Sequence, residues 1–130
     1  MQRQLPLIFY INRDMNTKKG KLKNAAIELA MQAIRLYDQI QGKAFLKNQM
    51  ARAATGVGAN IHEADYAESP DDFVHKLRIA LKECHESEFW MQILSESCPE
   101  LSDSAEKLRK DAGNIRYMLI SAINKVLEKE

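Results

Sequence analysis

The sequence contains few residues that interrupt helices. It has 3 prolines and 5 glycines in 130 residues, which favours an all-helical fold, because both residues are disfavoured in helix interiors. No internal repeat, low-complexity tract or interdomain linker is evident. The length suits one domain with a hydrophobic core.

The motifs that commonly hold metals, nucleotides or redox centres are also missing. The 2 cysteines, Cys84 and Cys98, lack the spacing of a metal or redox pair. The Glu-x-x-His pairs of di-metal helical bundles do not occur. Gly56 and Gly58 do not follow a predicted strand, as a nucleotide-binding loop would require. We therefore expect no cofactor, no metal site and no catalytic residue.

The chain has no apolar stretch of the length that spans a membrane. The run from Leu5 to Ile11 is far shorter than the ~20 residues that a spanning helix needs, and no small-residue cleavage site follows it. We expect a cytoplasmic protein without a membrane partner and with both thiols reduced. Residues 1–20 are predicted to be a loosely packed or strand-like appendage to a domain over 21–130.

Apolar residues recur in alternating steps of four and three through four segments. The predicted helices cover residues 21–41, 45–65, 70–97 and a last segment from 101 or 104 to 127. The inward positions of the third are Phe73, Leu77, Ala80, Cys84, Ser87, Met91 and Leu94. Short connections between four such helices predict an all-α, up-down-up-down antiparallel four-helix bundle with an N-terminal appendage.

The ends of the helices carry specific signals. Ser69 is a predicted N-cap, followed by Pro70 at the first helical position and Asp72 as a capping-box partner. Gly42 is predicted to end the first helix, and Pro99 to end the third. The last helix carries more apolar residues than one seam needs, which predicts burial against another subunit or against the appendage. The extra residues are Met118, Ile120, Ile123 and Leu127.

Polar residues form a stripe beside the apolar seam of the second helix, and two carboxylates share a face of the third. We expect a polar network, either structural or between subunits, that fixes the register of these helices. A solvated surface and a ligand site are the alternatives. An enzyme would require the same residues to converge in an open cleft. The predicted network comprises Gln49, Arg52, Asn60, Glu63, Glu83 and Glu86.

One combination of motifs resembles a known family. It consists of Gln-x-x-Arg-Ala-x-x-Gly-Val-Gly-Ala-Asn-Ile-x-Glu-Ala from Gln49, then Ser-x-x-Asp-Phe, Ile-Ala-Leu-Lys-Glu and Phe-Trp. It resembles the four-helix bundle proteins related to 23S rRNA intervening-sequence proteins, over about residues 22–127. The pattern often has serine where this chain has Gly56, and glycine where it has Ala64, so no role of a serine hydroxyl is carried over.

The resemblance implies partners but no catalytic activity. It implies a cyclic homo-oligomer, a pentamer, and a distant similarity to the accessory protein of diversity-generating retroelements. That protein is a basic barrel that binds nucleic acid and a reverse transcriptase. A nucleic-acid-binding module, for RNA or DNA, is therefore one hypothesis. A structural scaffold that binds only protein is the alternative.

The charge distribution bears on this choice. Residues 1–52 hold 10 Lys/Arg against 3 Asp/Glu, residues 53–106 hold 3 against 12, and residues 107–130 hold 6 against 3. Adjacent first and last helices would give the bundle a basic side, although scattered solubilising charge explains the counts equally well. The candidate phosphate contacts are Lys18, Lys19, Lys21, Lys23, Arg35, Lys107, Arg109 and Lys110. A contiguous basic patch would favour nucleic acid, and lysines paired with carboxylates would favour the scaffold.

Overall fold

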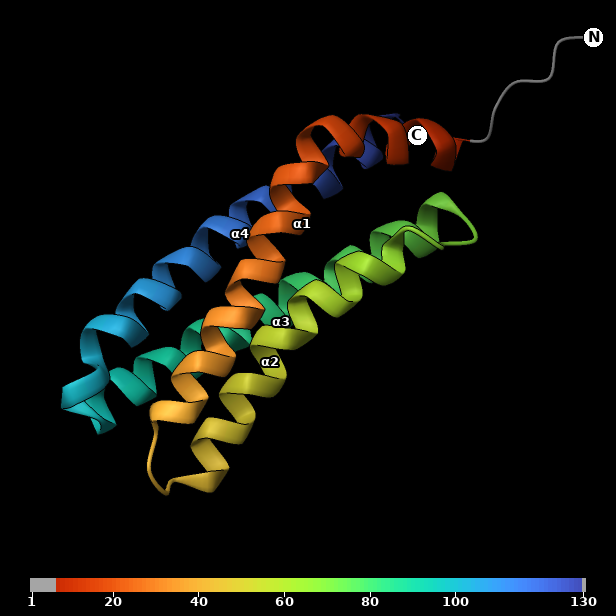
Figure 1. Cartoon of the computed structure of the whole chain (residues 1–130). Coiled ribbons are helices and arrows are strands. Elements are labelled where there is room, and N and C mark those ends of the chain that lie inside the picture. Colours follow the sequence, from red (N-terminus) through yellow and green to blue (C-terminus); the bar gives the residue numbers. More distant parts are fainter. Residues whose placement is uncertain (1–6, 130) are drawn as a thin grey trace, which may run out of the picture.

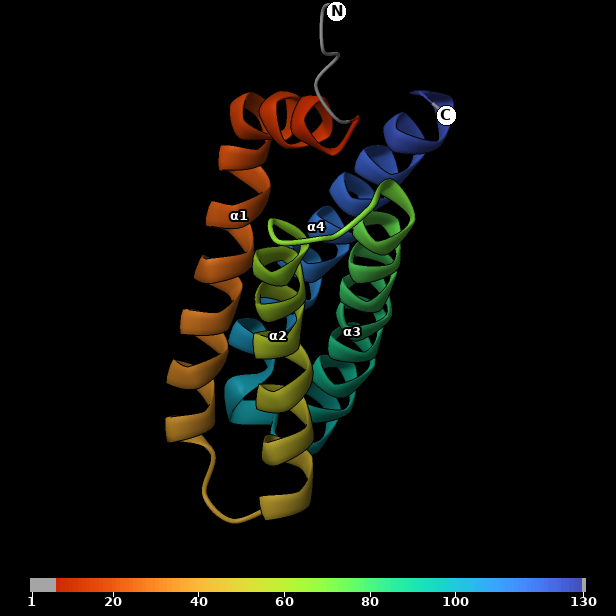
Figure 2. The ribbon, with the colours of Figure 1, turned by 90° about the vertical axis from the view of Figure 1, so that its right-hand side faces the viewer.

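The protein is an antiparallel bundle of four helices in the order that the sequence predicts. The structure, a computed structural model, describes the backbone of residues 7–129 and the side chains of residues 20–128. Helices α1 (Leu7–Gln39), α2 (Ala44–Ala64), α3 (Pro70–Ser97) and α4 (Ser102–Lys129) follow one another up and down the bundle (Figures 1 and 2). A 3-10 turn, Pro99–Leu101, joins the last two. The all-α four-helix fold is confirmed.

Each helix contacts its neighbours in sequence, and α1 closes the bundle against α4. The α1–α2 side and the α3–α4 side are therefore opposite sides of the bundle. The predicted inward seam of α3 is buried from Phe73 to Leu94. In α4, Ile123 is buried within the bundle, whereas Ile120 and Leu127 are exposed. Therefore only some of the extra apolar residues of α4 are exposed and available to contact a partner.

The strand-like alternative for residues 1–20 is wrong where the structure describes them. Residues 7–20 are helical and continue directly into the rest of α1, although the first turns run at an angle to the later ones (Figures 1 and 2). No proline occurs between Leu7 and Gln39 to interrupt the backbone hydrogen bonds. Residues 1–6 lie outside the described residues.

The turn between α1 and α2 differs from the prediction in one detail. Helix α1 ends at Gln39, and Gly42 lies in the turn with a φ of 68°, followed by Lys43 with a φ of 51°. Two left-handed residues in succession reverse the chain, and glycine takes this conformation without a steric cost. The Lys47 ammonium group donates to the Ile40 carbonyl at 3.2 Å, which satisfies an acceptor beyond the end of α1.

The start of α3 matches its predicted cap. The Ser69 hydroxyl accepts the backbone N–H of Asp72 at 3.0 Å, and the Asp72 carboxylate accepts the N–H of Glu68 at 3.1 Å. The carboxylate thus reaches one residue further back than in a standard capping box. Both interactions satisfy backbone donors at the point where the chain reverses between α2 and α3.

This cap gives a stability prediction. We expect Ser69→Ala to lower the free energy of unfolding by about 1 kcal/mol, because the Asp72 N–H loses its acceptor. Ser69→Asp is the control, since its carboxylate restores an acceptor beside the helix N-terminus. Urea denaturation of the three proteins at one concentration measures the difference. Equal losses in both variants would contradict a capping role for the hydroxyl.

Candidate functional site

A polar network joins α2 to α3 at the surface of the bundle. The Arg52 guanidinium group donates to the carboxylates of Glu86 and of Glu83, the latter at 3.4 Å. Its Nε and Nη2 atoms also donate to the Gln49 side-chain oxygen at 3.2 and 3.1 Å. The Trp90 indole N–H donates to Glu86 at 3.2 Å. Four of the six predicted residues therefore meet, together with a tryptophan that the prediction left out.

Gly56 makes room for this arrangement. A Cβ atom at position 56 would lie 3.3 Å from the side chain of Glu83, closer than side chains normally approach. The glycine therefore lets the Glu83 side chain lie against the backbone of α2, within reach of Arg52. Trp90 was detectable in the sequence, because it stands four residues after Glu86 on the same face of one helix.

Asn60 and Glu63 do not join the network. The Asn60 amide donates to the Gly56 carbonyl of its own helix at 2.8 Å, and the Glu63 carboxylate pairs with Lys76 at 3.4 Å. A short amide side chain inside a helix is readily satisfied by the carbonyl one turn earlier. Sharing a stripe on α2 was thus insufficient to bring these two residues to Glu83 and Glu86.

The network is suited to holding the register of α2 against α3. Both carboxylates are engaged by one cation, and the cation is half-exposed, so the ion pairs contribute modestly to stability. We expect Arg52→Gln to lower the free energy of unfolding by up to about 1 kcal/mol. Asn60→Ala, outside the network, should change it by less than about 0.5 kcal/mol. Urea denaturation compares the two, and a larger loss for Asn60→Ala would contradict the observed connections.

A second polar cluster, which sequence reasoning missed, joins α3 to α4. The Arg116 guanidinium group donates to both oxygens of Glu88 at 2.9 and 3.3 Å, and this contact raises the pKa of Arg116. The buried thiol of Cys84 donates to the Ala112 carbonyl at 2.9 Å. Burial, followed by the negative charge of Glu88, raises the pKa of Cys84 from 9.0 to about 12. Cys84 is therefore a core residue, as predicted, and it stays protonated at neutral pH.

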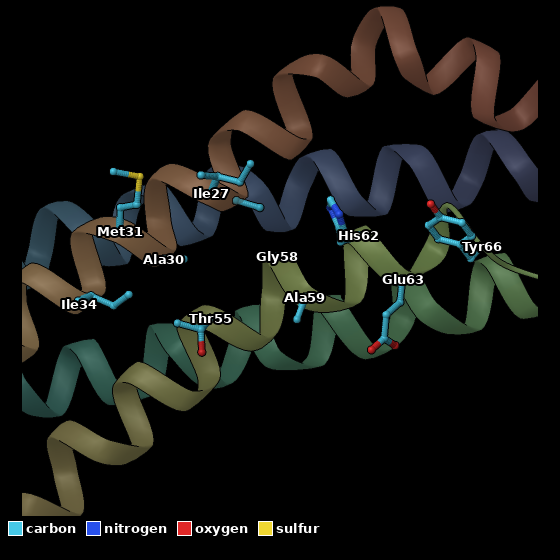
Figure 3. Close-up of a pocket in the computed structure, with 11 residues that line it drawn as sticks. Ile27, Ala30, Met31, Ile34, Thr55, Gly58, Ala59, His62, Glu63 and Tyr66 are labelled. Atoms are coloured by element: carbon cyan, nitrogen blue, oxygen red, sulfur yellow. The ribbon is translucent and has the colours of Figure 1, made fainter.

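An apolar groove of about 530 Å³ opens between α1 and α2 (Figure 3). Its walls on the α1 side include Ile27 and Ile34, whose side chains are 52% and 51% exposed. Small residues form its floor, where a Cβ on Gly58 would lie 3.6 Å from Ala26. The lining residues are Ala26, Ile27, Ala30, Met31, Ile34, Thr55, Gly58, Ala59, His62, Glu63 and Tyr66.

The predicted basic side of the bundle is partly neutralised. Lys23 pairs with Asp65, the residue that follows α2. Lys107 pairs with Asp111, and Arg109 pairs with Glu106. Lys21, Arg35 and Lys110 are exposed, and the side chains of Lys18 and Lys19 lie outside the described ones. Half of the candidate phosphate contacts with described side chains thus already have carboxylate partners. Because cations paired with carboxylates are expected of a scaffold, this result favours a scaffold over a phosphate-binding surface on α1 and α4.

Neither a metal-binding cluster nor a membrane-spanning helix occurs among the described residues. Among these residues, no three histidine, cysteine or acidic side chains converge as they would around a metal ion. None of the described helices is both long enough and apolar enough to cross a membrane.

Comparisons with known proteins identify the family. The family described as 23S rRNA-intervening sequence protein matches residues 18–121. A crystal structure of a protein with unknown function from the S23 ribosomal protein family, from Bacteroides thetaiotaomicron, is 34% identical. The match covers 78% of this chain and 97% of that one, with a TM-score of 0.72. A search of curated proteins finds no match. The chain belongs to the family of 23S rRNA-intervening sequence proteins.

Proposed function

We propose that the protein is a non-enzymatic binding module that assembles from several copies of this chain. The observation that carries the proposal is the exposed apolar groove between α1 and α2. Ile27, Met31 and Ile34 recur along one stripe of α1 and remain at least 44% exposed. A contiguous apolar surface of this kind is typical of an interaction site.

A second copy fits this groove because the bundle has a second apolar surface on its opposite side. Tyr117, Ile120 and Leu127 of α4 are exposed. They lie on the α3–α4 side, where the neighbouring Arg116 reaches Glu88 of α3. Two different surfaces that meet between copies form a head-to-tail contact, which closes into a ring when the rotation allows. This arrangement agrees with the cyclic pentamer that the family resemblance implies.

Light scattering coupled to size-exclusion chromatography tests the assembly. The monomer has a mass of 14.9 kDa, and we expect a single species of about five times that mass. A monomer at every concentration tested would overturn the proposal. An oligomer of another size would keep the self-association and reject the pentamer.

The second part of the proposal is that the protein binds nucleic acid, RNA in particular. We propose that it does so in the cytoplasm. The support is the family's description, which refers to 23S rRNA, together with exposed cations such as Arg78 and Lys82 of α3. Fluorescence anisotropy with structured RNA and with duplex DNA tests it. Binding should weaken steeply as the salt concentration rises. No binding at low salt would leave a protein-interaction scaffold as the function.

A further inference from the structure

The outward face of α3 carries basic and aromatic residues along one line. They recur in steps of three and four, so they share a narrow face of the helix opposite the buried seam. All of them are exposed. The residues are His75, Arg78, Lys82, His85 and Phe89. We refer to them as the α3 stripe, which extends over about 21 Å of the helix.

The cations of the α3 stripe are available to a partner. Arg78 and Lys82 have no ion pair among the residues whose side chains are described, although three glutamates stand close to them in sequence. Arg52 of α2 engages both Glu83 and Glu86 of α3, and the two helices lie side by side in Figure 2.

The remaining glutamate is engaged on the other side of the helix. Arg116 holds Glu88 toward α4, and the highly exposed His85 lies 3.4 Å from the same carboxylate. Asp71 and Glu96 stand beyond the two ends of the α3 stripe. The carboxylates beside the stripe are therefore ion-paired with arginines of other helices, and its central cations face solvent.

An aromatic cluster adjoins one end of the α3 stripe. The ring of Phe89 lies 5.0 Å from that of Trp90 at 73°, and the ring of Phe45 lies 5.8 Å from it at 80°. Trp90 is anchored by its hydrogen bond to Glu86, and both phenyl rings contact it edge to face. Phe45 is 67% and Phe89 55% exposed, which leaves ring surface available for stacking.

We propose that the α3 stripe and its aromatic cluster bind single-stranded nucleic acid. Arg78 and Lys82 contact backbone phosphates, and bases stack on Phe89 and Phe45. A row of cations beside stacking rings is the combination that proteins use for single strands, whose bases are free to stack on side chains. The inference rests on the nucleic-acid part of the proposed function, and it places the contact on α3 instead of on α1 and α4.

Two double variants test which surface binds. Arg78→Gln with Lys82→Gln removes two cations from the α3 stripe. Lys107→Gln with Lys110→Gln removes two exposed cations from α4 and leaves the same net charge. The probe is a fluorescein-labelled oligouridine of about 12 nucleotides, a length within the range of single-strand sites. Its anisotropy is measured from about 50 to 200 mM salt.

We expect the α3 double variant to bind the probe about tenfold more weakly and to reduce the slope of log K against log salt by about 1.4, the value for two phosphate contacts to a single strand. The α4 double variant should bind within about twofold of the wild type. Phe89→Ala should also weaken binding about tenfold, with an unchanged salt slope, because stacking releases no counterions. Circular dichroism checks that all variants remain helical.

The outcomes separate this inference from the proposed function. If the wild type binds, and either both double variants weaken binding equally or only the α4 variant weakens it, the α3 site is wrong. Nucleic-acid binding itself then still stands. Preference for the same oligouridine annealed to its complement overturns recognition of a single strand. Absence of wild-type binding at about 50 mM salt overturns both the inference and the nucleic-acid proposal, and leaves the self-assembly proposal to its own mass measurement.

Discussion

Ile34→Glu is expected to dissociate the oligomer into monomers. Ile34 lines the groove between α1 and α2 and is 51% exposed in the single chain, so a glutamate there is readily tolerated by a monomer. Within the proposed interface the same carboxylate would be buried without a partner, which costs several kcal/mol. Light scattering coupled to chromatography measures the loss of the oligomer.

The control adds the same charge to the same helix away from the groove. Gln39 is exposed on α1, is not among the lining residues and lies on a different face of the helix from Ile34, so Gln39→Glu should leave the oligomer intact. Ile120→Glu on α4 should dissociate it as Ile34→Glu does, because the proposed contact is head-to-tail and uses both surfaces. An oligomer that survives Ile34→Glu would show that the groove is not the contact between copies.

The second large effect is a loss of stability at high pH that depends on Cys84. In the folded chain its pKa is raised to about 12 from 9.0, so between these values the unfolded chain loses a proton that the folded chain keeps. Stability from this group is therefore fully present below pH 9.0 and decreases as the pH rises toward about 12. The expected decrease is about 1.4 kcal/mol per pH unit in that window.

Cys84→Ala provides the comparison, because every other titrating group is the same in the two proteins. Urea denaturation of both proteins at about pH 8 and at about pH 11 isolates the contribution of the thiol. The alanine variant should lose some stability at the lower pH, since it leaves a small cavity. The wild type should then lose more than the variant on going to the higher pH. Parallel losses would mean that the thiol is not held protonated by burial.

The sequence by itself determined the helices and most of their ends. The seam of α3 is buried as its spacing predicts, and Ser69 caps the helix as its position predicts. Both features are local, because spacing along one helix decides which face is apolar, and a cap uses the next few backbone N–H groups. The N-terminal segment was predicted to be loosely packed or strand-like, and the strand-like alternative was wrong because a short apolar run fits either a strand or a helix.

Tertiary structure alone decided which polar residues meet. Arg52 reaches Glu83 and Glu86, whereas Asn60, from the same polar stripe of α2, donates to the Gly56 carbonyl of its own helix. The outcome depends on the register of two helices that are distant in the sequence, which the spacing within either helix leaves open.

For the same reason, the α3 stripe could not be predicted from the sequence. Residues 53–106 count as the acidic part of the chain, with 3 Lys/Arg against 12 Asp/Glu, yet Arg78 and Lys82 lie exposed there without ion pairs among the described side chains. Arg52 and Arg116, from two other helices, form ion pairs with the neighbouring glutamates. A count of charges along the chain cannot predict which cations stay unpaired, because an ion pair joins charges that only the packing of the helices brings together.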